Sequence, residues 1–175
     1  FYERDALATK DDLLACISKC KGFAGSKKAS LAAKYVIEGS ASPMESIAAI
    51  LLTLPTHLGG FGLPRPELNR KIELDDGRRF YCDMYWETAK VAIEYDSDKC
   101  HTGATRIARD SKRRTALALD GTTVVTLTNE QVKSEDDMSE AARLLAKLLG
   151  ARKRPSVFAS SPERYRLRQE LLYGD

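Results

Sequence analysis

The first third of the chain repeats apolar residues at the spacing of an α-helix. In "DDLLACISKCK", residues 11–21, the apolar positions follow a helical period, and "GSKKASLAAKYVIEG" continues with a second short helix that Gly39 ends. A third helix is predicted for "SASPMESIAAILLTL", with Ser42 as N-cap, Pro43 at the first helical position and Glu45 three residues after the cap. We expect this helix to run to about Leu54.

The pattern changes to that of β-strands after a loop rich in glycine and proline at 59–66. "ELNRKIEL", a "DDG" turn and "RRFYCDMYW" predict a hairpin, and "KVAIEYD" adds a third strand. A basic helix at 102–121, the buried-type strand "TTVVTLT" and the amphipathic helix "EDDMSEAARLLAKLLG" follow. The order ααα-βββ-α-β-α predicts an α/β fold: a mixed sheet of about four strands, made of a three-stranded antiparallel meander, a crossover helix and a fourth strand, flanked by helices.

Composition sets the domain organisation. A chain of 175 residues with 43% hydrophobic content forms one principal domain, which we place at 40–150 after a helical preface at 1–39. Residues 151–175 form a basic carboxyl-terminal extension, in which a helix begins near Ser161. The chain begins at Phe1 rather than Met, so we expect a fragment of a longer protein.

Charge and cysteine usage restrict the environment but not the partner. A formal charge of +3 is too small to predict nucleic-acid binding, which must be argued from where basic residues cluster. The four cysteines form no paired framework, which is typical of a reducing compartment. No apolar run approaches the roughly 20 residues that span a bilayer. We therefore expect a cytoplasmic protein without a membrane segment.

Acidic residues stand at unusual places in the predicted hairpin. Glu94 and Asp96 are two residues apart on one strand, and a turn at 87–89 places Asp83 roughly opposite Glu94. The same alternation puts Cys82 with Met84 and Trp86 on the other face. Two like charges about 4 Å apart repel by roughly 4 kcal/mol at an effective dielectric near 20, so the cluster needs a cation or a shared proton. Carboxylates are hard oxygen ligands that suit Mg²⁺ or Mn²⁺.

Five segments in this order resemble a known nuclease family. "SPMESIAAILL", "CDMYW", "VAIEYDSDKCH", "RIARDSKRR" and "VVTLTNEQV" resemble the very-short-patch-repair endonuclease-like domains of the PD-(D/E)xK superfamily, over roughly residues 40–149. The resemblance implies a restriction-endonuclease-like core that hydrolyses DNA phosphodiester bonds with a metal ion. Such domains occur alone or behind a winged-helix unit in AbiEi-type abortive-infection and antitoxin-like proteins, so an upstream winged-helix domain or a toxin is a possible partner.

The resemblance also implies roles for individual residues. Asp83 matches the first Asp of the motif and Glu94 its (D/E) position, so metal ligands are expected at Asp83, Glu94 and Tyr95, with Glu45 near them. Asp96 stands where the general motif has lysine. His101, which follows that strand, could manage protons in place of the lysine, because its pKa lies near neutrality.

Each of these residues also has an ordinary interpretation. Glu45 is explained by capping, Asp96 by the end of a strand or an N-cap, and His101 by the entry to a helix. Basic residues on the following helix form either a solvated face or a DNA contact: Arg106, Arg109, Lys112 and Arg113. The sequence therefore leaves two main functions open: a metal-dependent endonuclease, or a degenerate nuclease fold that binds nucleic acid or a partner in a toxin–antitoxin or phage-defence regulator. A purely structural domain would leave the acids unexplained.

Overall fold

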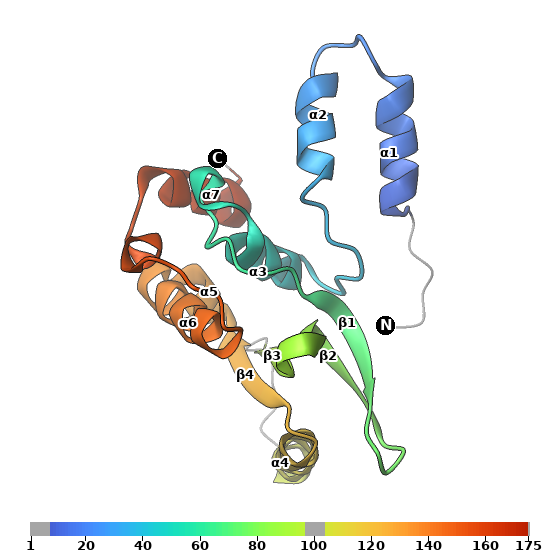
Figure 1. Ribbon diagram of the computed structural model, residues 1–175, viewed down its shortest axis with the longest axis vertical. Helices are drawn as coiled ribbons and strands as arrows, with labels where there is room; N and C mark the ends of the chain where they lie inside the picture. Colours follow the sequence, from blue (N-terminus) through green and yellow to red (C-terminus); the bar gives the residue numbers. More distant parts are fainter. Residues whose placement is uncertain (1–7, 97–103, 175) are drawn as a thin grey trace.

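A computed structural model describes residues 8–96 and 104–174, and side chains in the basic helix from Asp110 onward. The described chain begins with two antiparallel helices, α1 (Lys10–Lys19) and α2 (Ser26–Ala33), which project from the rest of the molecule (Figure 1). Helix α1 buries none of its residues, whereas Ala33 of α2 is buried. The predicted preface is therefore a helical hairpin that meets the body mainly through α2 and the segment after it.

Helix α3 (Pro43–Thr53) begins as its sequence predicts. The Ser42 hydroxyl accepts a hydrogen bond from the backbone N–H of Glu45, and Pro43 opens the first turn. After α3 and the short 3-10 helix η1 (Thr56–Leu58) the chain folds back, so that the N–H groups of Phe61 and Leu63 donate to carbonyl groups near the end of α3. A Cβ atom at Gly60 would lie 2.1 Å from the Leu54 carbonyl oxygen, so this return path requires glycine.

The four strands of the described chain form one mixed sheet in the order β1-β2-β3-β4. Strands β1 (Glu67–Glu73), β2 (Arg79–Trp86) and β3 (Val91–Asp96) are antiparallel neighbours, whereas β4 (Thr123–Thr128) is parallel to β3. Helix α4 (Ala104–Leu119) connects the parallel pair, as a parallel connection requires. The predicted α/β fold, with its meander, crossover helix and fourth strand, is confirmed.

Helices cover both faces of the sheet (Figure 1). On one face, α3 and α6 (Glu135–Leu148) pack against side chains that include Met84, Val91 and Ile93. On the other face, α4 packs against a smaller cluster that contains Cys82 and Tyr85. The prediction that Cys82 shares the face of Met84 and Trp86 is therefore wrong, because the alternation of β2 is interrupted between Cys82 and Tyr85. Asp83 lies at this irregular point.

The carboxyl-terminal segment is packed into the domain. A short helix that the sequence reading missed, α5 (Asn129–Lys133), follows β4 directly and starts with a capping box between Thr128 and Gln131. After η3 (Pro155–Phe158), helix α7 (Pro162–Tyr173) begins after the N-cap Ser161, as predicted.

Helix α7 contributes buried arginine to this packing. Arg164 is 3% exposed, donates to the carbonyls of Gly59, Ala159 and Val157, and lies 3.9 Å from the centre of the Phe61 ring. The basic residues of 151–175 thus include structural ones. Among the helices of the described residues, none has an apolar stretch of the length needed to span a bilayer.

Candidate functional site

Asp83 lies where strands β2 and β3 stop pairing. The β2–β3 ladder starts at the pair Trp86–Val91 and ends at the pair Met84–Ile93. The next residues along the two strands are Asp83 and Glu94. This agrees with the register predicted from the turn at 87–89. Beyond the last pair, the carboxylate of Asp83 accepts a hydrogen bond of 2.6 Å from the backbone N–H of Tyr95. A side chain thus satisfies the backbone group that the ladder leaves open, and this fixes the orientation of the carboxylate.

The surroundings of Asp83 disfavour its charge. Burial is the main reason that the pKa of this carboxyl rises to about 6. The Tyr95 N–H opposes the rise, the charges of Glu45 and Glu94 add to it, and Arg113 partly offsets them. Carboxylates from α3, β2 and β3 therefore interact electrostatically, which is typical of a functional site.

Glu45 approaches this place from the first turn of α3. It is only 7% exposed, and its Oε2 accepts a hydrogen bond of 2.9 Å from the backbone N–H of Ala41. This N–H belongs to the residue before the N-cap Ser42. Glu45 therefore caps the helix as predicted, but it bonds one residue earlier than in a standard capping box. Because its charge also raises the pKa of Asp83, Glu45 both caps the helix and contributes to the negative field of the site.

Glu94 faces a cation from the other layer of the molecule. Its Oε1 lies 2.8 Å from a terminal nitrogen of Arg113 on α4, and the two side chains are 18% and 29% exposed. The same arginine donates to the backbone carbonyl of Tyr81 and lies over the Phe80 ring. Helix α4 therefore brings one member of the predicted basic stripe to the carboxylates.

Asn69 belongs to the same neighbourhood and was not predicted. The flanking pairs Leu68–Met84 and Arg70–Cys82 place it opposite Asp83, and its φ of 47° is left-handed, which is uncommon inside a strand. Its side-chain amide donates to the Gly39 carbonyl and contacts Glu45 Oε2 at 3.5 Å. The sequence signal was an asparagine within a strand, since asparagine tolerates this conformation better than most residues.

Buried polar atoms that make no hydrogen bond gather here. Among described residues, five buried side-chain polar atoms have no hydrogen bond, and three of them are Asn69 Oδ1, Glu94 Oε1 and Arg113 Nε. Such atoms are rare in folded proteins and are expected where a water, ion or substrate binds. The hard oxygen atoms of Asp83 and Glu94 fit Mg²⁺ or Mn²⁺ in donor chemistry. Within the described residues, however, no three His, Cys, Asp or Glu side chains are grouped closely enough to hold an ion by themselves.

Some of the remaining predicted residues are described by the structure and others are not. Asp96 is exposed at the end of β3, opposite Thr128 of β4, and Lys112 is exposed on α4. The Tyr95 hydroxyl donates to Asn129 Oδ1 at 3.1 Å, a contact that does not test the prediction that Tyr95 is a metal ligand. His101 and the side chains of Arg106 and Arg109 lie outside the residues that the structure describes.

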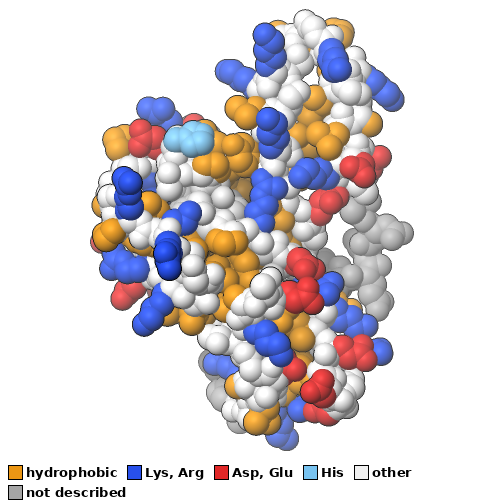
Figure 2. Space-filling model, viewed as in Figure 1, with side chains coloured by type: hydrophobic (Ala, Val, Ile, Leu, Met, Phe, Trp, Pro, Cys, Tyr) orange, Lys and Arg blue, Asp and Glu red, His pale blue; other side chains and the backbone are white. Residues whose placement is uncertain are grey.

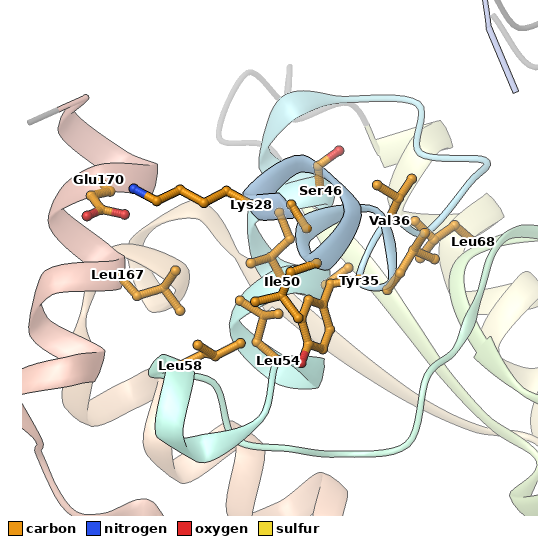
Figure 3. A pocket seen from close by; sticks show the side chains of 14 residues that line it. Lys28, Tyr35, Val36, Ser46, Ile50, Leu54, Leu58, Leu68, Leu167 and Glu170 are labelled. Atoms are coloured by element: carbon orange, nitrogen blue, oxygen red, sulfur yellow. The ribbon is translucent and has the colours of Figure 1, made fainter. Parts of the chain in front are cut away.

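An apolar pocket lies elsewhere, between the helical hairpin and the body. It has a volume of about 550 Å³ and is lined mainly by aliphatic side chains, among them Leu31, Ile50 and Leu167. In Figure 3 the side chain of Lys28 extends toward Glu170. Figure 2 shows apolar surface at the foot of the hairpin, which itself carries several lysines. Among the described residues, Lys28 and Glu170 are the only charged ones in its lining, whereas the carboxylate cluster combines several acids with a partly buried arginine and is therefore the better candidate site.

Comparison with known proteins gives a relationship without a function. Over 94 residues, 54% of this chain, the sequence is 32% identical to uncharacterized protein MT2308 of Mycobacterium tuberculosis strain CDC 1551 / Oshkosh. It matches uncharacterized protein Rv2248 of strain ATCC 25618 / H37Rv to the same extent. The match spans 32% of the length of each of these curated relatives. No protein-family model and no solved structure matches the chain.

Proposed function

We propose that this chain contains a metal-dependent DNA endonuclease-like domain that hydrolyses phosphodiester bonds. The observation that carries the proposal is the partly buried Asp83, held at the end of the β2–β3 ladder with its pKa raised to about 6 by burial and by two neighbouring acids. Carboxyl groups whose ionisation is disfavoured in this way are typical of a functional site, here one that binds a cation. The resemblance to very-short-patch-repair endonuclease-like domains, on the segments that contain these residues, supports the same function.

In this function Asp83 and Glu94 hold Mg²⁺ or Mn²⁺. A bound divalent ion polarises the phosphoryl oxygen and lowers the pKa of the attacking water. The Tyr95 N–H fixes the Asp83 carboxylate, and Glu45 adds negative charge that favours the cation. His101 is the proposed proton-transfer group, and Arg113, with Arg106 and Arg109 earlier on α4, provides guanidinium groups for the DNA backbone.

A second function is favoured by one contact. Arg113 forms an ion pair with Glu94, and Asp96 stands where the nuclease motif has lysine, so the fold could act without metal chemistry. In that case the domain is a nucleic-acid- or partner-binding module of a toxin–antitoxin or phage-defence regulator. An upstream winged-helix domain or a toxin would then be the partner of interest.

A nicking assay separates the two functions. Supercoiled plasmid is incubated with wild type in Mg²⁺ and in Mn²⁺, beside Asp83→Asn, His101→Ala and the control Asp75→Asn, which changes an exposed turn residue. The endonuclease proposal expects nicking by wild type and the control, and a loss of at least about a hundredfold in the other two, the usual size of an acid–base contribution. Absence of nicking by wild type, with DNA binding retained, would establish the binding module instead.

A further inference from the structure

The carboxylate cluster contains its own cation. Arg113 reaches it from α4, with one terminal nitrogen 2.8 Å from Glu94 Oε1 and a further hydrogen bond to the Tyr81 carbonyl. Its guanidinium carbon also lies 6.0 Å from the centre of the Phe80 ring. These contacts come from two strands of the sheet, so the guanidinium is held at the site and is not a freely solvated side chain of the helix face.

The pairing between Arg113 and Glu94 is nevertheless incomplete. An arginine in its best geometry with a carboxylate forms two parallel hydrogen bonds. Here the 2.8 Å contact does not qualify as a hydrogen bond, and among the described residues both Glu94 Oε1 and Arg113 Nε are buried without one. Each partner therefore retains unused bonding capacity: the carboxylate for a cation, and the guanidinium for an anion.

A divalent ion and the guanidinium cannot both contact Glu94 without repelling each other. A phosphate group offers the guanidinium the bidentate oxygens that Glu94 does not supply in this geometry. Binding of a DNA phosphate and release of Glu94 are therefore linked through one side chain. This coupling is reciprocal: a metal ion bound to Glu94 should raise the affinity for the phosphate by the same factor by which the phosphate raises the affinity for the metal ion.

The geometry points to Arg113 as an internal cation that occupies Glu94 in the free protein, competes with a divalent metal ion for it, and transfers to a DNA phosphate when DNA binds. This rests on the proposed function and adds regulation to it: the metal site is weak until a phosphate backbone arrives. Arg113 is in this sense a positioning residue, because it acts on the metal through Glu94.

Mn²⁺ affinity, measured by titration calorimetry, tests the competition without any cleavage. Arg113→Gln should bind Mn²⁺ about tenfold more tightly than wild type, because a competing charge is removed. The control Arg114→Gln, an exposed neighbour on α4, should bind Mn²⁺ as wild type does. Equal Mn²⁺ affinity in wild type and Arg113→Gln, with both proteins folded by circular dichroism, overturns the inference.

A second measurement uses wild type alone, in case Arg113→Gln does not fold. A short phosphorothioate duplex, which resists cleavage, should raise the Mn²⁺ affinity of wild type about tenfold. An unchanged affinity overturns the inference. If both affinity changes occur but no DNA is nicked, the nuclease proposal fails and the competition stands. If DNA is nicked but neither affinity changes, the competition fails and the nuclease proposal stands.

Discussion

Replacing Asp83 by asparagine should stabilise the protein at neutral pH while it removes the proposed metal site. The pKa of Asp83 is about 6 in the folded chain, against about 3.9 for an unperturbed aspartate. A difference of about two pH units corresponds to about 3 kcal/mol of unfolding free energy, and because the carboxyl is partly exposed, solvent screening reduces this to about 1–2 kcal/mol. Asparagine removes the charge, yet its side-chain oxygen still accepts the hydrogen bond from Tyr95.

The sign follows from proton linkage. Because the folded pKa is raised, the folded state holds this proton more tightly than the unfolded state does. The stabilising contribution of Asp83 is therefore fully present below about pH 4 and is lost as the pH rises through about 6. Asp83→Asn has no such loss. Its stability should therefore equal that of wild type near pH 4 and exceed it by the full amount at pH 7.5.

Thermal unfolding followed by circular dichroism at pH 4 and at pH 7.5 measures this difference. At pH 7.5 the melting temperature of Asp83→Asn should exceed that of wild type by about 2–8 °C, given the usual scaling for a chain of this size. Asp75→Asn, in the exposed turn between β1 and β2, should have the same melting temperature as wild type at both pH values. Added Mg²⁺ should stabilise wild type and not Asp83→Asn.

A lower stability of Asp83→Asn than of wild type at pH 7.5 would contradict a raised pKa for Asp83. An equal difference between the two proteins at both pH values would contradict it as well, because a difference that does not change with pH cannot come from the ionisation of Asp83. Either result would mean that Asp83 is too well solvated, and its neighbouring acids too well screened, to disfavour its charge. The carboxylate cluster would then not require a cation.

Two further predictions concern basic residues. Arg164→Met should lower the free energy of unfolding by about 3 kcal/mol or more, because the carbonyl groups that are bonded to the buried guanidinium lose their donor. Urea denaturation measures this change, and replacement of the exposed Arg166 by methionine should have little effect. A triple alanine variant of the α4 stripe should bind duplex DNA more weakly and lower the slope of log affinity against log salt by roughly 2–3, since each neutralised phosphate contributes about 0.9. Fluorescence anisotropy at several salt concentrations measures that slope, and an unchanged value excludes the stripe as the DNA contact. The stripe comprises Arg106, Arg109 and Arg113.

Part of the candidate site could be predicted from the sequence because the relevant interactions are local. The hairpin register follows from a short turn and the period of a strand, and it brings Asp83 level with Glu94 at the end of the ladder. The start of α3, with Ser42 as N-cap and Glu45 in the first turn, follows from capping chemistry within a few residues. The interrupted alternation at Cys82 was not predictable in this way, because a left-handed Asn69 on the neighbouring strand accompanies it.

Periodicity and helix caps act over a few residues, so they predict the main helices and strands, the mixed four-stranded sheet and the acids of the β2–β3 hairpin, but they did not predict α5. Tertiary packing sets which distant groups meet those acids. Asn69 of β1 and Arg113 of α4 reach the cluster through the sheet register and the packing of the crossover helix. Arg164 likewise meets Gly59 across 105 residues of chain, so a residue that reads as part of a basic tail becomes a buried structural one. Such encounters depend on how whole layers pack, and no local pattern encodes them.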